Sequence, residues 1–146
     1  MSAPLPATER HAATAKPANA QTLSIPAALK ASVSTGKAVF VKNCLVCHQA
    51  DGGGVQNLNP TLIKTSYVLG KKNRLINVLL KGMSQKTIDG EKYSNAMPSH
   101  SFLTDKQIAD VLTYVRNSFG NKASAVTIGE VKTVRSKSKI KEKNTK

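Results

Sequence analysis

The chain has 146 residues, of which 40% are hydrophobic and 4% aromatic, and its formal net charge is +14. This length leaves room for one domain. No uninterrupted apolar run reaches the roughly eighteen residues that a transmembrane helix needs, so none is predicted. The positive charge favours acidic partners or polyanions.

Composition divides the chain into three parts. Residues 1–33 are rich in Ala, Pro and Thr, and residues 131–146 alternate Lys, Ser and Thr, so both ends are predicted to be flexible, the first as a linker or tail. The span 34–130 carries the apolar periodicity and is predicted to form the folded domain. The basic C-terminal end holds seven Lys/Arg and one Glu. This charge would attract polyanions in general, but it does not form a specific nucleic-acid motif.

The first helix of the central span is expected over about residues 35–43, and it leads directly into Cys44. A Gly-rich loop at 51–54 follows, where a regular element is disfavoured. A second helix is predicted over about 71–81, with Gly82 placed as its C-terminal cap. Its apolar face consists of Leu75, Ile76, Val78, Leu79 and Leu80.

Residues 87–93 predict a small hairpin with Asp89-Gly90 as its turn. The last predicted helix begins after Thr104, whose capping-box partner is Gln107. Helical spacing then continues to Gly120, which should end the helix. The apolar stripe of this helix consists of Ile108, Val111, Leu112, Val115 and Phe119.

Cys44, Cys47 and His48 form the sequence C-x-x-C-H, which is the signature of covalent c-type haem attachment. Two thiols on one backbone turn can each add to a vinyl group of the porphyrin. The adjacent imidazole then falls beneath the ring and can bind the iron, whose axial ligands set its redox potential. We therefore predict one haem c attached through both cysteines.

Three other interpretations of Cys44 and Cys47 are weaker. A thioredoxin-like redox pair needs a βαβ context, and no strand-rich segment precedes the motif. A structural zinc site needs four Cys or His ligands, whereas the chain has only two cysteines, and His11 and His100 are isolated. A disulfide closing so small a loop would stabilise little.

The second axial ligand has four candidates. Met97 is preferred because it precedes Pro98 in an irregular, polar segment between the hairpin and the last helix, where a lone apolar side chain has no evident packing role. His100 is the main competitor and would lower the redox potential. Met83 follows the cap of the second helix and is expected to pack, and His11 lies in the N-terminal tail. An open sixth position would instead suit a catalytic or gas-binding haem.

Several stretches resemble class I monohaem cytochromes c: residues 36–40, 44–48, 97–98 and 111–115. The resemblance implies an all-α cytochrome c fold, with three to five short helices around one covalent haem and a hairpin before the distal ligand loop. It also implies that small and aromatic residues of the first helix pack against the last. The residues concerned are Gly36 and Phe40 in the first helix, and Val111 and Tyr114 in the last.

The resemblance also implies roles for Pro60 and Tyr93. Pro60 stands where the family has a proline whose carbonyl accepts a hydrogen bond from the proximal imidazole, which would fix its orientation. Tyr93 is a candidate partner for a haem propionate. A narrower likeness is to cytochrome domains attached to or serving copper nitrite reductases and quinoprotein sugar or alcohol dehydrogenases. It runs through residues 88–98, 103–105, 111–117, 119–121, 126–131 and Arg135.

These features predict a single-electron carrier, not an enzyme in itself, with His48 and Met97 as iron ligands. A metal-free polyanion-binding module using the basic tail is the alternative of another class. Because haem c is attached outside the cytoplasm, we expect an extracytoplasmic location, in the periplasm or at the outer face of the membrane. The N-terminus lacks the pattern of a secretory signal, so any signal or membrane tether is expected to lie outside this chain.

The expected partners are acidic redox proteins of the oxidase, nitrite reductase or quinoprotein dehydrogenase classes, without specific nucleic-acid binding, and the chain is expected to be a monomer. A weak and transient interface suits redox exchange. The exposed haem edge would be ringed by basic residues, and association should slow with salt. The candidate basic residues are Lys42, Lys64, Lys71 and Lys72.

Overall fold

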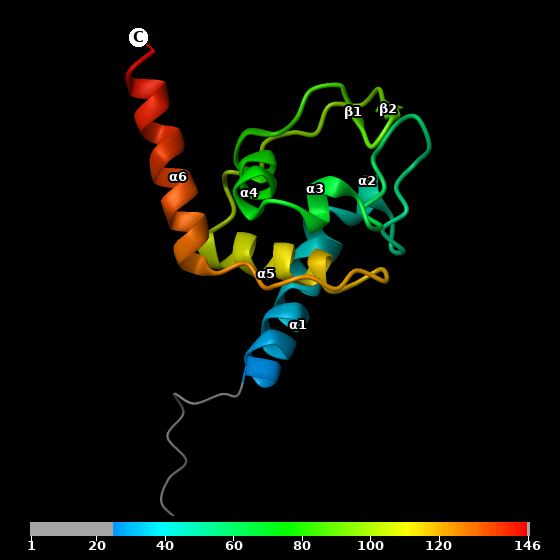
Figure 1. The fold of residues 1–146 in the computed structure, drawn as a ribbon, viewed down its shortest axis with the longest axis horizontal. Coiled ribbons are helices and arrows are strands. Elements are labelled where there is room, and N and C mark those ends of the chain that lie inside the picture. Colours follow the sequence, from blue (N-terminus) through cyan, green and yellow to red (C-terminus); the bar gives the residue numbers. More distant parts are fainter. Residues whose placement is uncertain (1–24, 146) are drawn as a thin grey trace, which may run out of the picture.

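The structure, a computed structural model, describes residues 25–145. Within them, short helices and one hairpin are joined by long loops (Figure 1). The all-α cytochrome c architecture predicted from the sequence is confirmed, with six helices in this range where three to five were expected. The elements are α1 (Ile25–Asn43), α2 (Leu45–His48), α3 (Ser66–Leu69), α4 (Lys72–Lys81), β1 (Lys86–Ile88), β2 (Glu91–Tyr93), α5 (Asp105–Arg116) and α6 (Ile128–Lys143).

The central packing contact is the crossing of α1 over α5 (Figure 1). Gly36 allows it, because a Cβ at this position would collide with the carbonyl oxygen of Asp110 and lie 2.8 Å from Cβ of Tyr114. One turn later Phe40 packs against Tyr114 and Phe119, with ring centroids 5.3 and 5.5 Å apart. The predicted contact between the first helix and α5 is confirmed.

The predicted N-terminus of α5 is confirmed in detail. The Thr104 hydroxyl accepts a hydrogen bond from the Gln107 backbone amide, and the Gln107 side chain accepts one from the Thr104 amide. The predicted end is wrong, because the helix stops at Arg116 and not at Gly120. Phe119 adopts a left-handed backbone conformation (φ 58°) outside the helix, and its ring returns to the core through its contacts with Phe40 and Tyr114.

The hairpin and α4 also follow the prediction. Strands β1 and β2 pair antiparallel, with Lys86 opposite Tyr93 and Ile88 opposite Glu91. Asp89 and Gly90 form the turn, both with positive φ. The Asp89 carboxylate accepts a hydrogen bond from the Ser66 amide at 2.8 Å, which ties the turn to α3. The Ser66 side chain and then its backbone amide lower the pKa of Asp89.

The expectation of a flexible tail over residues 131–146 is wrong, because α6 occupies most of it. A capping box of Thr127 and Glu130 starts the helix. Val131 and Val134, three residues apart on one face, are buried where α6 packs on α4 and α5. The lysine-rich composition of residues 131–146 did not indicate that the first half of this helix is amphipathic. Figure 1 shows α6 beside α4.

The N-terminal boundary also moves. The predicted flexible linker includes residues 25–33, but in the structure α1 begins at Ile25. Pro26 lies in the first turn of α1, where the absence of a proline N–H costs no helical hydrogen bond. The Ser32 hydroxyl donates to Asp110 at 2.7 Å, so this part of α1 also contacts α5. The prediction for residues 1–24 lies outside the described residues. No helix of the described part is long and apolar enough to cross a membrane.

We predict that Gly36→Ala lowers the free energy of unfolding by about 3 kcal/mol, because the new methyl group must push α1 away from the backbone of α5. Urea denaturation of the haem-loaded protein measures this. Gly129→Ala is the matched control, since a Cβ there meets only the Thr127 hydroxyl at 3.9 Å and should stabilise α6 by about 0.5 kcal/mol. Equal stability of Gly36→Ala and the parent would contradict the crossing geometry.

Candidate haem pocket

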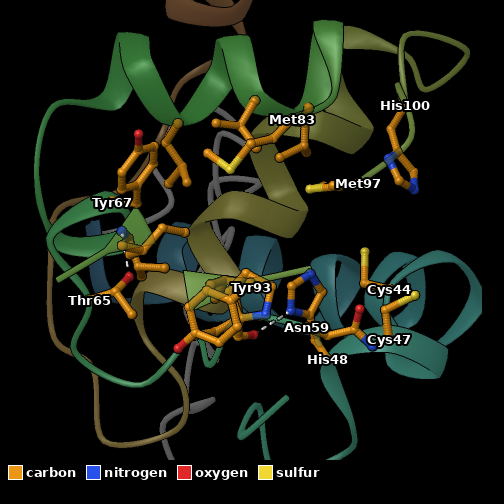
Figure 2. Close-up of a pocket in the computed structure, with 18 of the residues that line it drawn as sticks. Cys44, Cys47, His48, Asn59, Thr65, Tyr67, Met83, Tyr93, Met97 and His100 are labelled. Carbon is orange, nitrogen blue, oxygen red and sulfur yellow. Dashed lines mark hydrogen bonds between the residues drawn. The ribbon is translucent and has the colours of Figure 1, made fainter. Parts of the chain in front are cut away.

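A large open pocket lies between the α1–α2 junction and the segment that follows the hairpin (Figure 2). Its empty space, with the open mouth included, is about 1210 Å³. Its lining is predominantly apolar and comes from almost every element of the fold. Buried side chains in its walls include Phe40, Val68, Leu75, Leu79, Val111, Leu112 and Val115.

Cys44, Cys47 and His48 come from one wall of the pocket (Figure 2). The amide of Cys44 donates to Phe40 O at 2.8 Å, so α1 passes without a break into the turn that carries the motif. The two thiols form no disulfide. Cys44 is half-buried and Cys47 exposed; burial, and secondarily the nearby Cys47, raise the pKa of the Cys44 thiol to about 11.

His48 is held in one orientation by the backbone. Its Nδ1 lies 2.9 Å from the carbonyl oxygen of Pro60, the contact that the family resemblance implied. Burial lowers the pKa of His48, against an opposing effect of the Pro60 hydrogen bond and with a smaller lowering effect of His100, so the ring is neutral at pH 7. A neutral ring that donates from Nδ1 has its free lone pair on Nε2.

Gly54 allows the Pro60 carbonyl to approach His48. It has φ +66°, and a Cβ there would lie 2.5 Å from the Pro60 oxygen. Its amide donates to His48 O at 2.9 Å, so the loop folds back on the motif that precedes it. The Gly-rich loop, predicted only to be irregular, therefore has a structural role at the ligand.

Met97 lies on the wall opposite His48 (Figure 2). Its backbone pairs with Met83 in an isolated antiparallel bridge, with N to O distances of 2.7 and 2.9 Å. Both methionines line the pocket. Figure 2 shows the Met97 sulfur across from the His48 ring, while Met83 lies closer to α4.

His100 is buried at the margin of the same pocket. Its Nδ1 lies 2.9 Å from Pro98 O, its amide donates to Leu79 O at 2.7 Å, and its ring centroid lies 5.6 Å from that of Phe102. The structure therefore brings His48, Met97, Met83 and His100 to one pocket. The fourth candidate ligand, His11, lies outside the described residues.

Tyr93 lines the pocket as well, as does Leu62. Sequence reasoning missed Tyr67, whose ring lies 4.0 Å beneath the Arg74 guanidinium, and Thr65, which caps α3 through Val68 N. Both line the pocket (Figure 2). A capping Thr before a short helix was the available signal for Thr65.

Two buried polar side chains beyond the pocket hold its walls and were also missed. Asn121 accepts a hydrogen bond from Lys64 N at 2.7 Å and donates to Leu62 O and Val115 O at 2.9 Å each. Arg116 donates to Val68 O at 2.7 Å and to Ser124 O at 2.8 Å. They fasten the loop after Pro60 and the end of α3 to α5.

Among the four basic residues proposed to ring the site, Lys72 differs from the others. It forms an ion pair with Glu130 of α6 at 3.1 Å, which contributes to lowering the pKa of Glu130. Lys42, Lys64 and Lys71 are exposed. Val46, between the two thiols, is 82% exposed and does not line the pocket.

The residues fit a covalently attached haem. Two thiols on one turn, a neutral imidazole with a free ring nitrogen and a thioether on the facing wall are the donors that such a group requires. Apolar side chains suit the faces of a macrocycle. Across residues 25–145, no three His, Cys, Asp or Glu side chains gather into a metal site, so a zinc interpretation gains no support there.

Comparison with known proteins agrees with this geometry. The cytochrome c family model matches residues 33–119. The chain is 37% identical over 103 residues to the cytochrome c subunit of a quinone alcohol dehydrogenase from Gluconacetobacter polyoxogenes, a match that covers 68% of this chain and 22% of that protein.

Two further relatives are the gluconate 2-dehydrogenase cytochrome c subunit of Pantoea cypripedii, 33% identical over 69% of this chain and 24% of the relative, and the fructose dehydrogenase cytochrome subunit of Gluconobacter japonicus, 35% identical over 68% and 22%. The chain spans only about a quarter or less of these relatives' length. The family match and the haem-attachment motif lead to one conclusion. The chain belongs to the cytochrome c family, and it is an electron-transport protein that carries a covalently bound c-type haem.

Proposed function

We propose that this chain is a single-electron carrier whose haem, linked through Cys44 and Cys47, is held between His48 and Met97. The observation that carries the proposal is the placement of a fixed neutral imidazole and a thioether on facing walls of one pocket (Figure 2). When bound, the haem supplies an iron that alternates between the ferric and ferrous states. The chain supplies the ligands, their orientation and an apolar surrounding.

Both proposed ligands are held by backbone hydrogen bonds. The Pro60 carbonyl orients His48, and the bridge to Met83 fixes the backbone of Met97. Ligands held in this way need not move when the charge on the site changes by one. A neutral thioether, together with apolar walls, disfavours the more highly charged oxidised state and so raises the redox potential.

Contacts in the pocket support Met97 over its competitors. The His100 ring packs beside Phe102 at the side of the pocket, whereas the Met97 sulfur lies across from the His48 ring (Figure 2). Met83 shares the bridge with Met97 and lies nearer α4 (Figure 2). We therefore assign Met83 to packing and Met97 to the iron.

The relatives' names support a partner class. Because they are cytochrome subunits of alcohol, gluconate and fructose dehydrogenases, we propose that this domain exchanges electrons with a dehydrogenase of that kind, outside the cytoplasm and as a monomer. The +14 charge favours an acidic docking surface. Cys47 lines the pocket and is exposed, and we propose that electrons enter and leave at the edge beside it. Tyr93 is proposed to contact a propionate.

The covalent link predicts a mass. Protein matured in a host that attaches haem c should have the mass of the chain plus one haem, because both thiols add to it. Acid-acetone extraction should leave the colour with the protein. The double variant Cys44→Ala/Cys47→Ala should return the bare chain mass and lose its haem on extraction, and a bare mass for the parent would contradict the proposal.

The ligand assignment predicts that only one of three substitutions changes the spectrum. Met97→Ala should abolish the far-red absorption band that marks sulfur bound to ferric iron, lower the redox potential and let carbon monoxide bind the reduced protein rapidly. His100→Ala and Met83→Leu should keep the band and, like the parent, should not bind carbon monoxide rapidly. Loss of the band in His100→Ala, or a parent that binds carbon monoxide at once, would overturn the assignment.

The charge near the open edge predicts opposite salt effects for two small probes. Oxidation of the reduced protein by ferricyanide, an anion, should slow as salt rises, and oxidation by the cationic tris(phenanthroline)cobalt(III) should accelerate. Lys42→Glu, two residues before Cys44, should slow the ferricyanide reaction roughly threefold at low salt. Lys143→Glu, in the last turn of α6, changes the net charge equally and should have a smaller effect; equal effects would refute a localised edge.

A further inference from the structure

The segment from Met97 to Thr104 carries the proposed ligand and contains no helix or strand of its own. One side of it is bonded to the end of α4. The Ser99 hydroxyl donates to Leu80 O and the His100 amide donates to Leu79 O, both at 2.7 Å. These bonds, with the Met83 bridge, hold the first half of the segment.

The second half is held from the other side by a single side chain of α6. Arg135 Nη1 donates to Ser101 O at 2.9 Å, Nη2 donates to Leu103 O at 2.7 Å, and Nε donates to the Asp105 carboxylate at 2.7 Å. The three nitrogen atoms of one guanidinium therefore bind two backbone carbonyls of the segment and the side chain of the first residue of α5.

Helix α6 is itself firmly placed. Val131 is fully buried and Val134 is 5% exposed, both in the main core cluster. The Lys72–Glu130 ion pair and the Ser138–Asn77 hydrogen bond at 3.2 Å join it to α4. The guanidinium is thus presented to the segment from a rigid element and not from a mobile tail.

We propose that Arg135 is a positioning residue for the distal iron ligand. By binding Ser101 O and Leu103 O it closes the segment against the α4 side and keeps Met97 over the pocket, so that other ligands cannot displace it. The proposal rests on the role of Met97 proposed above. It also gives α6, whose lysine-rich sequence suggested only a tail, a function at the site.

The geometry requires arginine. Its planar fork can serve two carbonyls and a carboxylate at once, whereas an ammonium group is a single point charge that cannot span them. Because Arg135 and Asp105 are 21% and 24% exposed, their ion pair is partly screened by water. The two carbonyl bonds should therefore matter more to the segment than the ion pair.

The test is displacement of Met97 by imidazole in the ferric holoprotein, followed by loss of the far-red band. Arg135→Ala and Arg135→Lys, which both lose the fork, should bind imidazole on the order of tenfold more tightly than the parent, a change of about 1.4 kcal/mol. Asp105→Asn loses the ion pair but keeps both carbonyl bonds, and it should stay within about twofold of the parent on the same scale.

Glu130→Gln is the control for α6 docking. Glutamine can replace glutamate in the capping box, while the ion pair with Lys72 is lost, so this variant weakens the attachment of α6 without touching the segment. Imidazole affinity should not change, even if urea denaturation gives a lower unfolding free energy. An affinity that follows global stability across the four variants would overturn the proposal, as would full rescue by Arg135→Lys.

The assignment of Met97 as ligand and the positioning role of Arg135 can be rejected independently. A parent protein without the far-red band would reject Met97 as the ligand. A parent with the band, and Arg135 variants with unchanged imidazole affinity, would reject only the positioning role. If Arg135→Ala does not mature with haem, Arg135→Lys decides the question alone.

Discussion

The close crossing of α1 and α5 at Gly36 determines where everything else in this domain can lie. Because α1 ends immediately before Cys44 and α2 follows at once with Cys47 and His48, the position of α1 on α5 fixes the wall of the pocket that carries the attachment motif. The aromatic contacts among Phe40, Tyr114 and Phe119 complete that junction. A displacement of α1 would move both thiols and the imidazole together, whereas an equal change in a surface loop would not.

The facing wall is organised differently. It is built from irregular chain, and its position comes from hydrogen bonds to the end of α4 and to Arg135 of α6 rather than from helix packing. The pocket between the two walls is predominantly apolar, and exposed Cys47 lies at its edge. This arrangement suits electron exchange, because both proposed ligands can stay in place while the partner approaches the open edge.

The sequence predicted what depends on local signals. The Thr104–Gln107 capping box, the Asp89-Gly90 turn and the apolar face of α4 can each be recognised within a few residues, and all are present. The Thr127–Glu130 capping box has the same spacing, but the lysine-rich sequence that follows it does not indicate a packed helix. Val131 and Val134 are buried only because α4 and α5 pack against α6. Contacts such as Arg135 with Ser101, 34 residues apart, cannot be inferred from spacing at all.

Of the three methionines, Met97 is the one proposed to face His48 across the bound haem, and proton NMR of the reduced protein with ¹³C-labelled methionine methyl groups can identify it. A methyl group held over the face of an aromatic macrocycle is strongly shielded by the ring current. The account predicts one methionine methyl signal far upfield of the others, still present in Met83→Leu. A spectrum with no displaced methyl signal, or one whose displaced signal disappears in Met83→Leu, would contradict it.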